Sequence, residues 1–460
     1  MQQTSTIKMS AGERRATLGL AGVYGVRMLG LFLILPVFAL FAEGLPGATP
    51  FLTGLAVGIY GLTQAMLQIP FGLLSDRIGR KPVIFAGLLL FAFGSAVAGA
   101  ADDVWQVIIG RALQGSGAVS AAVMALAADL TREENRTKAM ATIGMTIGAS
   151  FMLALLAGPV LGRLIGVSGI FWLTAVLALL AIALVALVVP TPTHSTTHRD
   201  AEAVPAMFRR VFSSTDLLRL DLGIFSLHLI LTALFLSIPL VLRDLGLAPV
   251  QHATLYLPVM LVSVAAMVPF IIIAERSGKM KQVLLGAVAA LVLSQFAFGL
   301  FANDFWGFVA ALTVFFTAIN LLEAMMPSLV SKVAPVDAKG TAMGVYSTSQ
   351  FTGAFCGGML GGWVHQQFGL TAVFEAGALV ALLWLLVASG MRRPGRYFSR
   401  LVSLDTVAVG GDPGELLDRL RGVPGVVEAV VVADEGVAYL KIDRDRLDPM
   451  ALDEIVARPA

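Results

Sequence analysis

The chain has 460 residues, of which 57% are hydrophobic and 13% charged, with a formal net charge of +2 and a mean hydropathy of +0.84. An average soluble domain carries about 25% charged residues, so this composition excludes a protein whose whole surface faces water. The single cysteine, Cys356, excludes an intramolecular disulfide and a cysteine-based metal site.

Twelve apolar segments divide most of the chain. A helix needs about 20 residues to cross the hydrocarbon core, and only helices or closed barrels satisfy the backbone in lipid. These segments are too long and too continuously apolar for barrel strands, so they predict an all-α polytopic membrane protein. The long first segment predicts a retained helix and not a cleaved signal. The twelve lie at 17–43, 51–75, 82–101, 104–130, 137–163, 168–190, 217–243, 250–275, 280–301, 304–333, 337–366 and 369–392.

Lysine and arginine gather in every second loop between these segments. The alternate loops hold only Arg163 and Arg243. Cytoplasmic loops of membrane proteins carry the excess of basic residues, so both termini are expected in the cytoplasm. The expected location is a bacterial inner membrane, crossed many times.

The longest polar interruption among the spans is 191–216, which divides them into six and six. It predicts a cytoplasmic linker with a short amphipathic helix at 205–213. The expected units are therefore two six-helix halves, at 15–190 and 217–396, joined by this linker.

The loop between the second and third spans recurs between the eighth and ninth. FGLLSDRIGRK begins at Phe71 and FIIIAERSGKMK begins at Phe270, so that Asp76 matches Glu275 and Arg80 matches Lys279. A weaker match links the fifth and eleventh spans. Such a duplication predicts two pseudo-symmetric halves with a binding site between them near the membrane midplane.

Three short motifs carry a resemblance to a known family. GLLSDRIGRKP at 72–82 closely resembles the signature loop of major facilitator transporters, and RALQGSG at 111–117 resembles their span-4 motif. GPVLG at 158–162 resembles the span-5 motif of the drug:proton antiporters. The sequences at 320–332 and 340–353 resemble the YajR subgroup, whose members carry an extra cytoplasmic C-terminal domain. The resemblance implies a twelve-span antiporter fold and fixes no substrate.

The signature loop is predicted to hold a gating latch that forms in one conformation and breaks in another. Glycines allow close helix approach and a tight turn, and Asp76 is expected to accept from a helix N-terminus or from an arginine across the halves. Arg80 is expected to pair with the carboxylate at the end of span 4. The alternative is that these charges only enforce topology. The latch residues are Gly72, Asp76, Arg77, Gly79, Arg80 and Asp129.

Ionisable residues within the spans are candidates for proton coupling. Arg27 lies near the bilayer centre, where an arginine is costly unless it is paired or faces water. Glu323 is the only carboxylate well inside a span of the second half, and a buried acid can exchange a proton near neutral pH. Glu323 is therefore predicted as the proton carrier or as the partner of Arg27. The alternative is a satisfied acid at a water-facing mouth.

Two further residues join this group. Arg111 begins the span-4 motif, and the resemblance implies that it tunes the protonation of a nearby acid. His228 lies in the middle of span 7 and titrates in the useful range, although a lone membrane histidine is as often only hydrogen-bonded. Asp221, near the start of the same span, is expected at the interface.

A central cavity of mainly apolar character is predicted between the halves, with a few hydrogen-bonding side chains. Neither a cofactor nor a metal ion is expected there. The candidate lining residues are Met28, Phe32, Tyr60, Gln64, Gln114, Phe235, Tyr256, Met260, Asn320, Gln350 and Phe351.

The segment from about residue 397 onward is polar and compatible with water. Its strand and helix signals follow the order β-α-β-β-α, with a first strand at 406–411 and a helix that begins at Pro413. This order predicts a small α+β ferredoxin-like domain at 401–458, which resembles heavy-metal-associated domains in layout. Those domains bind metal through cysteines where this chain has Gly410, Gly411 and Asp412. The domain is expected to self-associate or to contact the transporter core.

Three functions remain open. The first is proton-coupled efflux of amphipathic small molecules by a secondary active transporter that works by alternating access. The second is a uniporter or proton symporter for a polar metabolite, and the third is a membrane sensor with a regulatory C-terminal domain. The sequence lacks a nucleotide-binding loop and a nucleophile constellation, so neither enzyme activity nor nucleic-acid binding is expected. The expected partners are a small-molecule substrate, protons and the lipid bilayer, and the expected state is a monomer.

Overall fold

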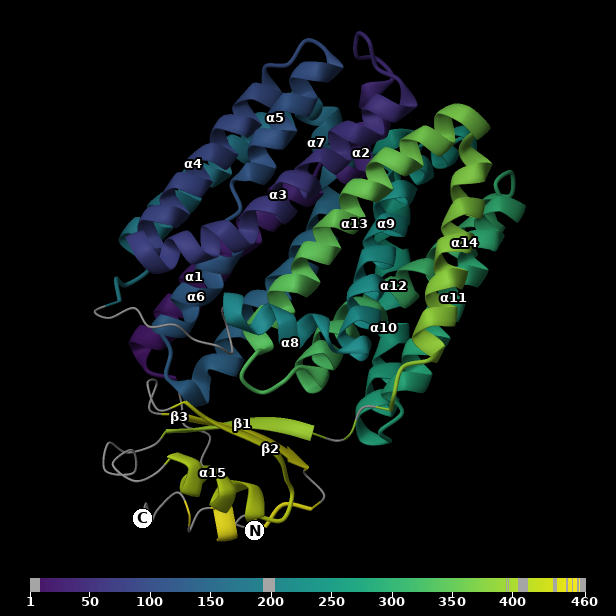
Figure 1. The fold of residues 1–460 in the computed structure, drawn as a ribbon. Coiled ribbons are helices and arrows are strands. Elements are labelled where there is room, and N and C mark those ends of the chain that lie inside the picture. Colours follow the sequence, from purple (N-terminus) through teal and green to yellow (C-terminus); the bar gives the residue numbers. More distant parts are fainter. Residues whose placement is uncertain are drawn as a thin grey trace.

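The computed structural model describes residues 9–192, 203–393, 395, 397–403, 413–432, 437–443, 446–448, 450–452 and 455. A bundle of long helices stands above a small domain of strands and helices (Figure 1). The end of the bundle next to this C-terminal domain is called the domain end below, and the opposite one the far end. Ten of the described helical segments are long and apolar enough to cross a membrane.

The first half contains two broken helices. The predicted first span consists of α1 (Ala11–Phe32) and α2 (Leu35–Ala42), because Pro36 at the start of α2 has no N–H to continue the ladder. The predicted fourth span consists of α5 (Val104–Ser116) and α6 (Ser120–Asp129). Between these two broken helices lie α3 (Pro50–Ile78) and α4 (Arg80–Gly99).

The predicted fifth and sixth spans are two helices that follow each other as the arms of α7 (Glu133–Leu187) and are separated by a kink at Gly166. The φ of Gly166 is 70°, a left-handed conformation that favours glycine. The first arm of α7 meets α1 in rising order, with Thr146 beside Gly25 and Gly158 beside Leu33. The second arm meets it in falling order, with Leu184 beside Gly22 and Thr174 beside Gly30. The two arms therefore run in opposite directions and make two crossings.

The second half has six helices, one for each predicted span. They are α9 (Thr215–Asp244), α10 (His252–Arg276), α11 (Met280–Leu300), α12 (Phe305–Val333), α13 (Lys339–Phe368) and α14 (Leu370–Ser389). A short turn, η2 (Pro249–Gln251), precedes α10. The helix α13 is rich in glycine, threonine and serine, and its hydropathy is therefore lower than that of the other spans. When α7 is counted as two crossings and α13 as one, the described helices make twelve crossings, as predicted.

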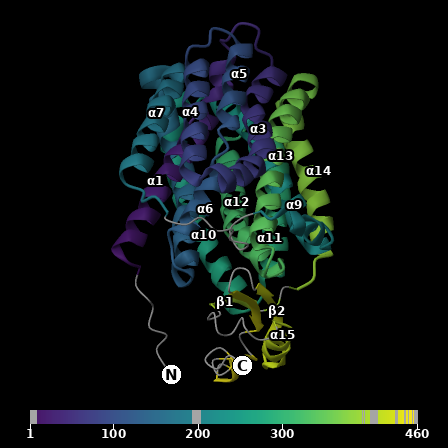
Figure 2. The same ribbon diagram turned by 60° about the vertical axis from the view of Figure 1, so that its left-hand side comes forward.

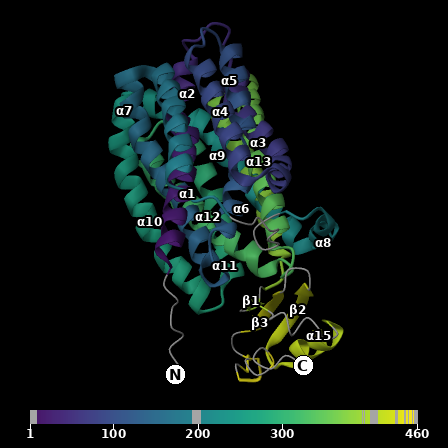
Figure 3. The ribbon, with the colours of Figure 1, turned by 90° about the vertical axis from the view of Figure 1, so that its left-hand side faces the viewer.

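The linker between the halves carries the predicted short helix. It is formed by η1 (Pro205–Met207) and α8 (Phe208–Phe212), and α8 lies beside the domain end of the bundle (Figure 3). The rest of the predicted linker, residues 193–202, lies outside the described residues.

The closest contact between the halves is made by α3 and α13, which run side by side through the centre of the bundle (Figure 1). A Cβ atom on Gly58 would lie 2.7 Å from the carbonyl oxygen of Phe355, and one on Gly61 would lie 2.5 Å from that of Phe351. Any larger residue would push the helices apart. By contrast, Gly144 and Gly148 of α7 have nothing within 4 Å of the position a Cβ atom would take.

The described part of the C-terminal domain contains a three-stranded antiparallel sheet with the order β1-β3-β2 and the helix α15 against it (Figure 2), and residues 450–452 and 455 are helical as well. Its elements are β1 (Tyr397–Ser403), α15 (Pro413–Gly422), β2 (Val426–Val432) and β3 (Val437–Asp443). Its core contains Val402, Leu420, Ala429 and Leu440. This arrangement fits the predicted ferredoxin-like unit.

The start of this domain differs from the prediction. The first strand begins at Tyr397 and therefore lies upstream of the predicted boundary at 401. The predicted strand at 406–411 and the glycines 410 and 411 with Asp412 lie outside the described residues.

Candidate functional site

Arg27 lies inside the first half and is 1% exposed. Its guanidinium donates to Ser120 Oγ at 2.7 Å, to Tyr60 Oη at 3.0 Å and to Gln64 Oε1. The expected partner on another helix is therefore present, but it consists of neutral groups from α3 and α6. The prediction that Glu323 pairs with Arg27 is wrong, because Arg27 contacts Ser120, Tyr60 and Gln64 whereas Glu323 lies beside a histidine of the second half.

Arg111 is likewise 1% exposed and meets neutral groups. It donates to Gln114 Oε1 at 2.8 Å and to the carbonyl oxygens of Ala56 and Val57, both at 3.4 Å. Its guanidinium carbon lies 4.9 Å from the centre of the Tyr60 ring. Within the described part of the chain no carboxylate contacts Arg111, so the acid that the resemblance implied is not beside it.

Gln114 was predicted to line the substrate cavity. The side chain is fully buried, accepts from Arg111 and donates to Ser95 Oγ at 2.6 Å. It serves as a bridge between α5 and α4, so the prediction of a cavity-lining amide is wrong at this position.

Glu323 of α12 meets a histidine of α9 and a glutamine of α13. Glu323 Oε1 lies 3.3 Å from His228 Nε2, and Gln350 Nε2 lies 2.8 Å from the same nitrogen. The Glu323 side chain is 34% exposed and that of His228 is 14% exposed. An imidazole next to a carboxyl group can share or pass its proton. The structure thus brings together two residues that the sequence had singled out separately.

The residues predicted to line the cavity divide into two groups. Met28, Tyr60, Phe235, Tyr256 and Met260 are each at most 3% exposed, and Gln64 is fully buried. Partly exposed are Phe32, Asn320, Gln350 and Phe351. The buried group packs in the interior, whereas the partly exposed group keeps surface for a ligand.

Aromatic rings connect the two halves at this level. The rings of Phe32 and Phe151 lie 5.2 Å apart, and Phe151 lies 5.9 Å from Phe235 and 6.4 Å from Phe316. Phe151 and Phe316 were not predicted from the sequence. No spacing distinguishes them from the other phenylalanines in the spans, because ring contacts between helices depend on helix tilt and rotation.

The far end is closed by contacts across the halves. Arg243 at the end of α9 forms an ion pair with Glu43, which follows α2. The backbone N–H of Phe51, at the start of α3, donates to Gln366 Oε1 of α13 at 3.2 Å. The Phe51–Gln366 bond lies on the same pair of helices, α3 and α13, that the glycines bring together, and the Arg243–Glu43 pair adds a contact between α9 and the end of α2.

The domain end of the first half holds the predicted latch. Arg80 Nε lies 3.1 Å from Asp129 Oδ2, and Arg80 also contacts Asp76 and donates to Ser75 Oγ at 2.9 Å. The side chains of Arg80 and Asp129 are 2% and 0% exposed. The expected contact is therefore present, and its role as a gate stays a prediction.

The rest of this loop explains its sequence. The φ of Gly79 is 98°, which favours glycine, and a Cβ on Gly72 would lie 3.0 Å from Ala121 Cβ. Arg77 is exposed. The expectation that Asp76 accepts from a helix N-terminus or across the halves is wrong, because Arg80 of the same loop is its partner.

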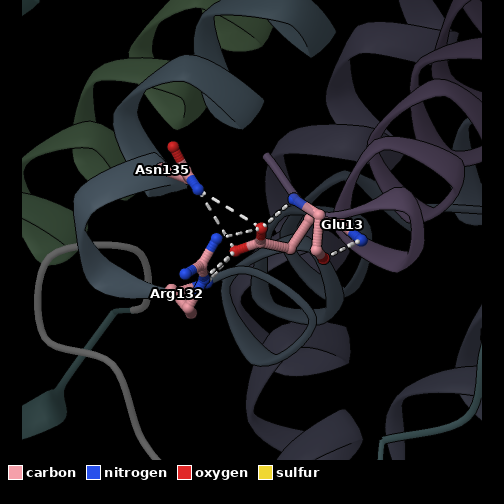
Figure 4. A network of polar contacts seen from close by, with 4 residues as sticks. Glu13, Arg132 and Asn135 are labelled. Atoms are coloured by element: carbon pink, nitrogen blue, oxygen red, sulfur yellow. Dashed lines mark hydrogen bonds and ion pairs between the residues drawn. The ribbon is translucent and has the colours of Figure 1, made fainter. Parts of the chain in front are cut away.

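A second network at the domain end was missed. Glu13 accepts from Arg132 Nη2 at 2.9 Å and from the backbone N–H of Arg132, also at 2.9 Å, and Asn135 donates to it at 3.2 Å (Figure 4). Ser10 and Glu13 form a capping box at the start of α1. The sequence SAGE at 10–13 was the available signal. The network fastens α1 to the start of α7.

The C-terminal domain contacts the helical core. Arg210 of α8 donates to Asp337 at 2.7 Å and to Glu428 of β2 at 2.6 Å. Lys441 of β3 donates to the carbonyl oxygens of Ala334 at 3.0 Å and Val333 at 3.4 Å, at the end of α12. One of the two expected placements of the domain is thus confirmed, and self-association stays a prediction.

Apolar packing strengthens this contact. Val336, in the loop between α12 and α13, packs with Val432, Val437 and Tyr439 of the sheet. Lys441 is 8% exposed, and this burial lowers the pKa of its ammonium group, although Glu428 raises it and Arg210 lowers it further. The lysine therefore remains at the contact only because the helix end offers carbonyl acceptors.

The fold and the signature loop define a membrane transporter. The chain belongs to the Major Facilitator Superfamily, whose family profile matches residues 20–351 and, in a second match, 220–402. It is 47% identical over 436 residues to the inner membrane transport protein YajR of Escherichia coli strain K12, which covers 95% of this chain and 96% of YajR. The multidrug resistance protein MdtH of Yersinia enterocolitica is 25% identical over 348 residues, 74% of this chain and 84% of MdtH.

Two solved structures share the fold. A bacterial homologue of the human lysosomal transporter Spinster has a TM-score of 0.65 and 14% identity, covering 84% of this chain and 98% of its own. The human organic anion transporter MFSD10 has a TM-score of 0.62 and 18% identity, covering 82% and 100%.

Proposed function

We propose that this transporter couples the movement of protons to the efflux of amphipathic small molecules by alternating access. The observation that carries the proposal is the contact between Glu323 and His228, 3.3 Å apart between α9 and α12. A carboxyl group beside an imidazole gives the second half a site that can bind and release a proton. Arg27 and Arg111 give the first half fixed positive charge held by neutral groups.

The contacts between the halves support alternating access. The far end is closed by the glycine contacts of α3 and α13 and by the Glu43–Arg243 pair. The opposite conformation requires these contacts to separate while each half moves as a unit. The partly exposed Phe32, Asn320, Gln350 and Phe351 supply the mixed apolar and polar surface that an amphipathic ligand needs.

The orientation follows from the same proposal. The domain end, which carries the basic loops, faces the cytoplasm, and the far end faces outward. The similar protein YajR is named as an inner membrane transport protein, which supports the same location here. The name of MdtH supports drug-like substrates, with the weight that 25% identity allows.

The substitution Glu323→Gln tests the coupling. It keeps the shape of the side chain and removes its proton site, so we expect transport driven by a pH gradient to fall to background. The measurement is transport of ethidium, a lipophilic fluorescent cation, by the full chain in proteoliposomes with an imposed pH gradient. Glu375→Gln, an exposed glutamate of α14, is the matched control and should behave as wild type. Wild-type transport by the Glu323→Gln variant would refute the proposal.

The same assay separates the alternatives. A uniporter would move its substrate equally with and without the pH gradient, and a proton symporter would move it along with the protons instead of against them. The docked C-terminal domain favours an additional regulatory role, because it touches the ends of α12 and the linker helix α8. A pure sensor would transport nothing in either condition.

A further inference from the structure

Several buried polar atoms gather between α9, α12 and α13. Asp221 Oδ2, His228 Nδ1, Asn320 Nδ2 and Tyr346 Oη have no hydrogen-bond partner among the described residues, and Glu323 Oε1 has only its 3.3 Å contact with His228 Nε2. Buried polar groups in proteins are nearly always hydrogen-bonded, to protein or to ordered water. A group of such atoms in one interface therefore indicates ordered water.

Asp221 was expected at the membrane interface, but it is 7% exposed. It lies seven residues before His228 on α9, and therefore on the same face, two turns or about 10 Å nearer the domain end. The neighbouring cation Arg219 is held by Asp216 at 2.9 Å. Asp221 is thus a carboxyl group inside the protein that the latch and the proton site do not use.

Tyr346 lies near both carboxyl groups. The helices α9 and α13 are in close contact, with Gly353 against the carbonyl of Phe225 and Gly357 against that of Leu229. Tyr346 and Gln350 are four residues apart and share a face of α13. Both Asp221 and Glu323 are near enough to Tyr346 to act on its hydroxyl electrostatically. The tyrosine is 3% exposed.

We propose that Asp221, Tyr346 and ordered water form a proton path from the domain end of α9 to Glu323. This proposal rests on the proposed proton coupling and identifies where the proton enters the protein. Asp221 takes a proton from the solvent at the domain end and passes it to the water chain. The Tyr346 hydroxyl accepts one proton as it donates its own, Glu323 becomes protonated, and Asp221 returns to the carboxylate.

The path predicts a slow proton transfer when either residue loses its polar group. Asp221→Asn and Tyr346→Phe keep the size of their side chains and remove the relay atoms. After a rapid drop in pH, infrared difference spectroscopy on the purified full chain follows the carbonyl band of protonated Glu323, identified by its loss in Glu323→Gln. We expect each variant to reach the wild-type band amplitude at a rate at least about tenfold lower.

Matched controls separate the path from general damage. Asp244→Asn lies at the opposite end of the same helix, and Tyr24→Phe removes a hydroxyl in the first half, so both should show the wild-type rate. Wild-type rates in both Asp221→Asn and Tyr346→Phe would overturn the path alone. The absence of any Glu323 band in the wild type would refute the proton site, and the path with it.

A second measurement covers the case in which Asp221→Asn fails to fold. Millisecond radiolysis of the wild type in isotopically labelled water oxidises side chains that touch ordered water. We expect Tyr346 to be labelled more strongly than Tyr24, although Tyr346 is the more buried of the two. Equal or weaker labelling of Tyr346 would overturn the path without any substitution.

Discussion

The domain end of the first half is held by its own residues, whereas the same end of the second half is held by the tail. In the first half Arg80 joins Asp76 and Asp129. In the second half the repeated loop is exposed at Glu275 and Lys279. The end of α12 carries Lys332, which contacts the Met280 sulfur at 3.1 Å.

The difference shows that the two copies of the loop are fastened by different contacts. Two basic residues, Lys279 and Lys332, cannot form the pair that Arg80 and Asp129 form. The end of α12 instead receives Lys441 on its last carbonyls, and the following loop receives Arg210 through Asp337. A lysine at a helix C-terminus stabilises it. The C-terminal domain thus fastens this end of α12, where the first half uses Arg80 and Asp129.

The largest effect is expected from Asp129→Asn. The pair is buried, and removing one partner of a buried pair costs about 3 kcal/mol or more because the other charge remains. Thermal unfolding of the purified protein in detergent should show a clearly lower Tm. The matched control is Asp216→Asn, whose ion pair is partly exposed. Equal Tm values for Asp129→Asn and wild type would show that the first half does not depend on its latch.

A smaller effect is expected from Arg210→Gln, which removes both ion pairs between the linker, the core and the domain. The Arg210 side chain is 43% exposed, so each pair contributes at most about 1 kcal/mol. Hydrogen exchange of β2 and of the loop 334–338 should rise by up to about fivefold. The difference should shrink at high salt, which screens exposed charges.

The neighbouring Arg209→Gln is the control for this variant, since Arg209 is also exposed on α8. It should leave hydrogen exchange unchanged. Exchange that is equally slow in Arg210→Gln would show that Lys441 and the apolar packing of Val336 hold the domain without the ion pairs.

The sequence was sufficient for the features that depend on one helix or one loop. Span positions follow from hydropathy, and the need of Arg27 for a partner follows from its depth. The Arg80–Asp129 contact followed from two charges at adjacent helix ends. Each of these arguments uses spacing along the chain, which the sequence gives directly.

Contacts between distant helices were not predictable in the same way. Glu323 and His228 were each identified, but their contact depends on the rotation of α9 and α12. The partner predicted for Arg27 was therefore wrong. The strand at Tyr397–Ser403 was missed because the segment 406–411 has the stronger strand signal, with its valines and the turn-forming glycines that follow them. The strand β1 is recognised only by its pairing with β3 in space.

The smallest effect is expected from Lys332→Met, which tests the second half of the comparison. Lys332 occupies the end of α12 as Asp129 occupies the end of α6, but among the described residues its side chain contacts the thioether of Met280. Removing its charge should change stability by less than about 0.5 kcal/mol, so Tm should stay near the wild-type value. A loss as large as that of Asp129→Asn would show that the second half has a latch of its own. The tail would then be an addition to that latch and not its replacement.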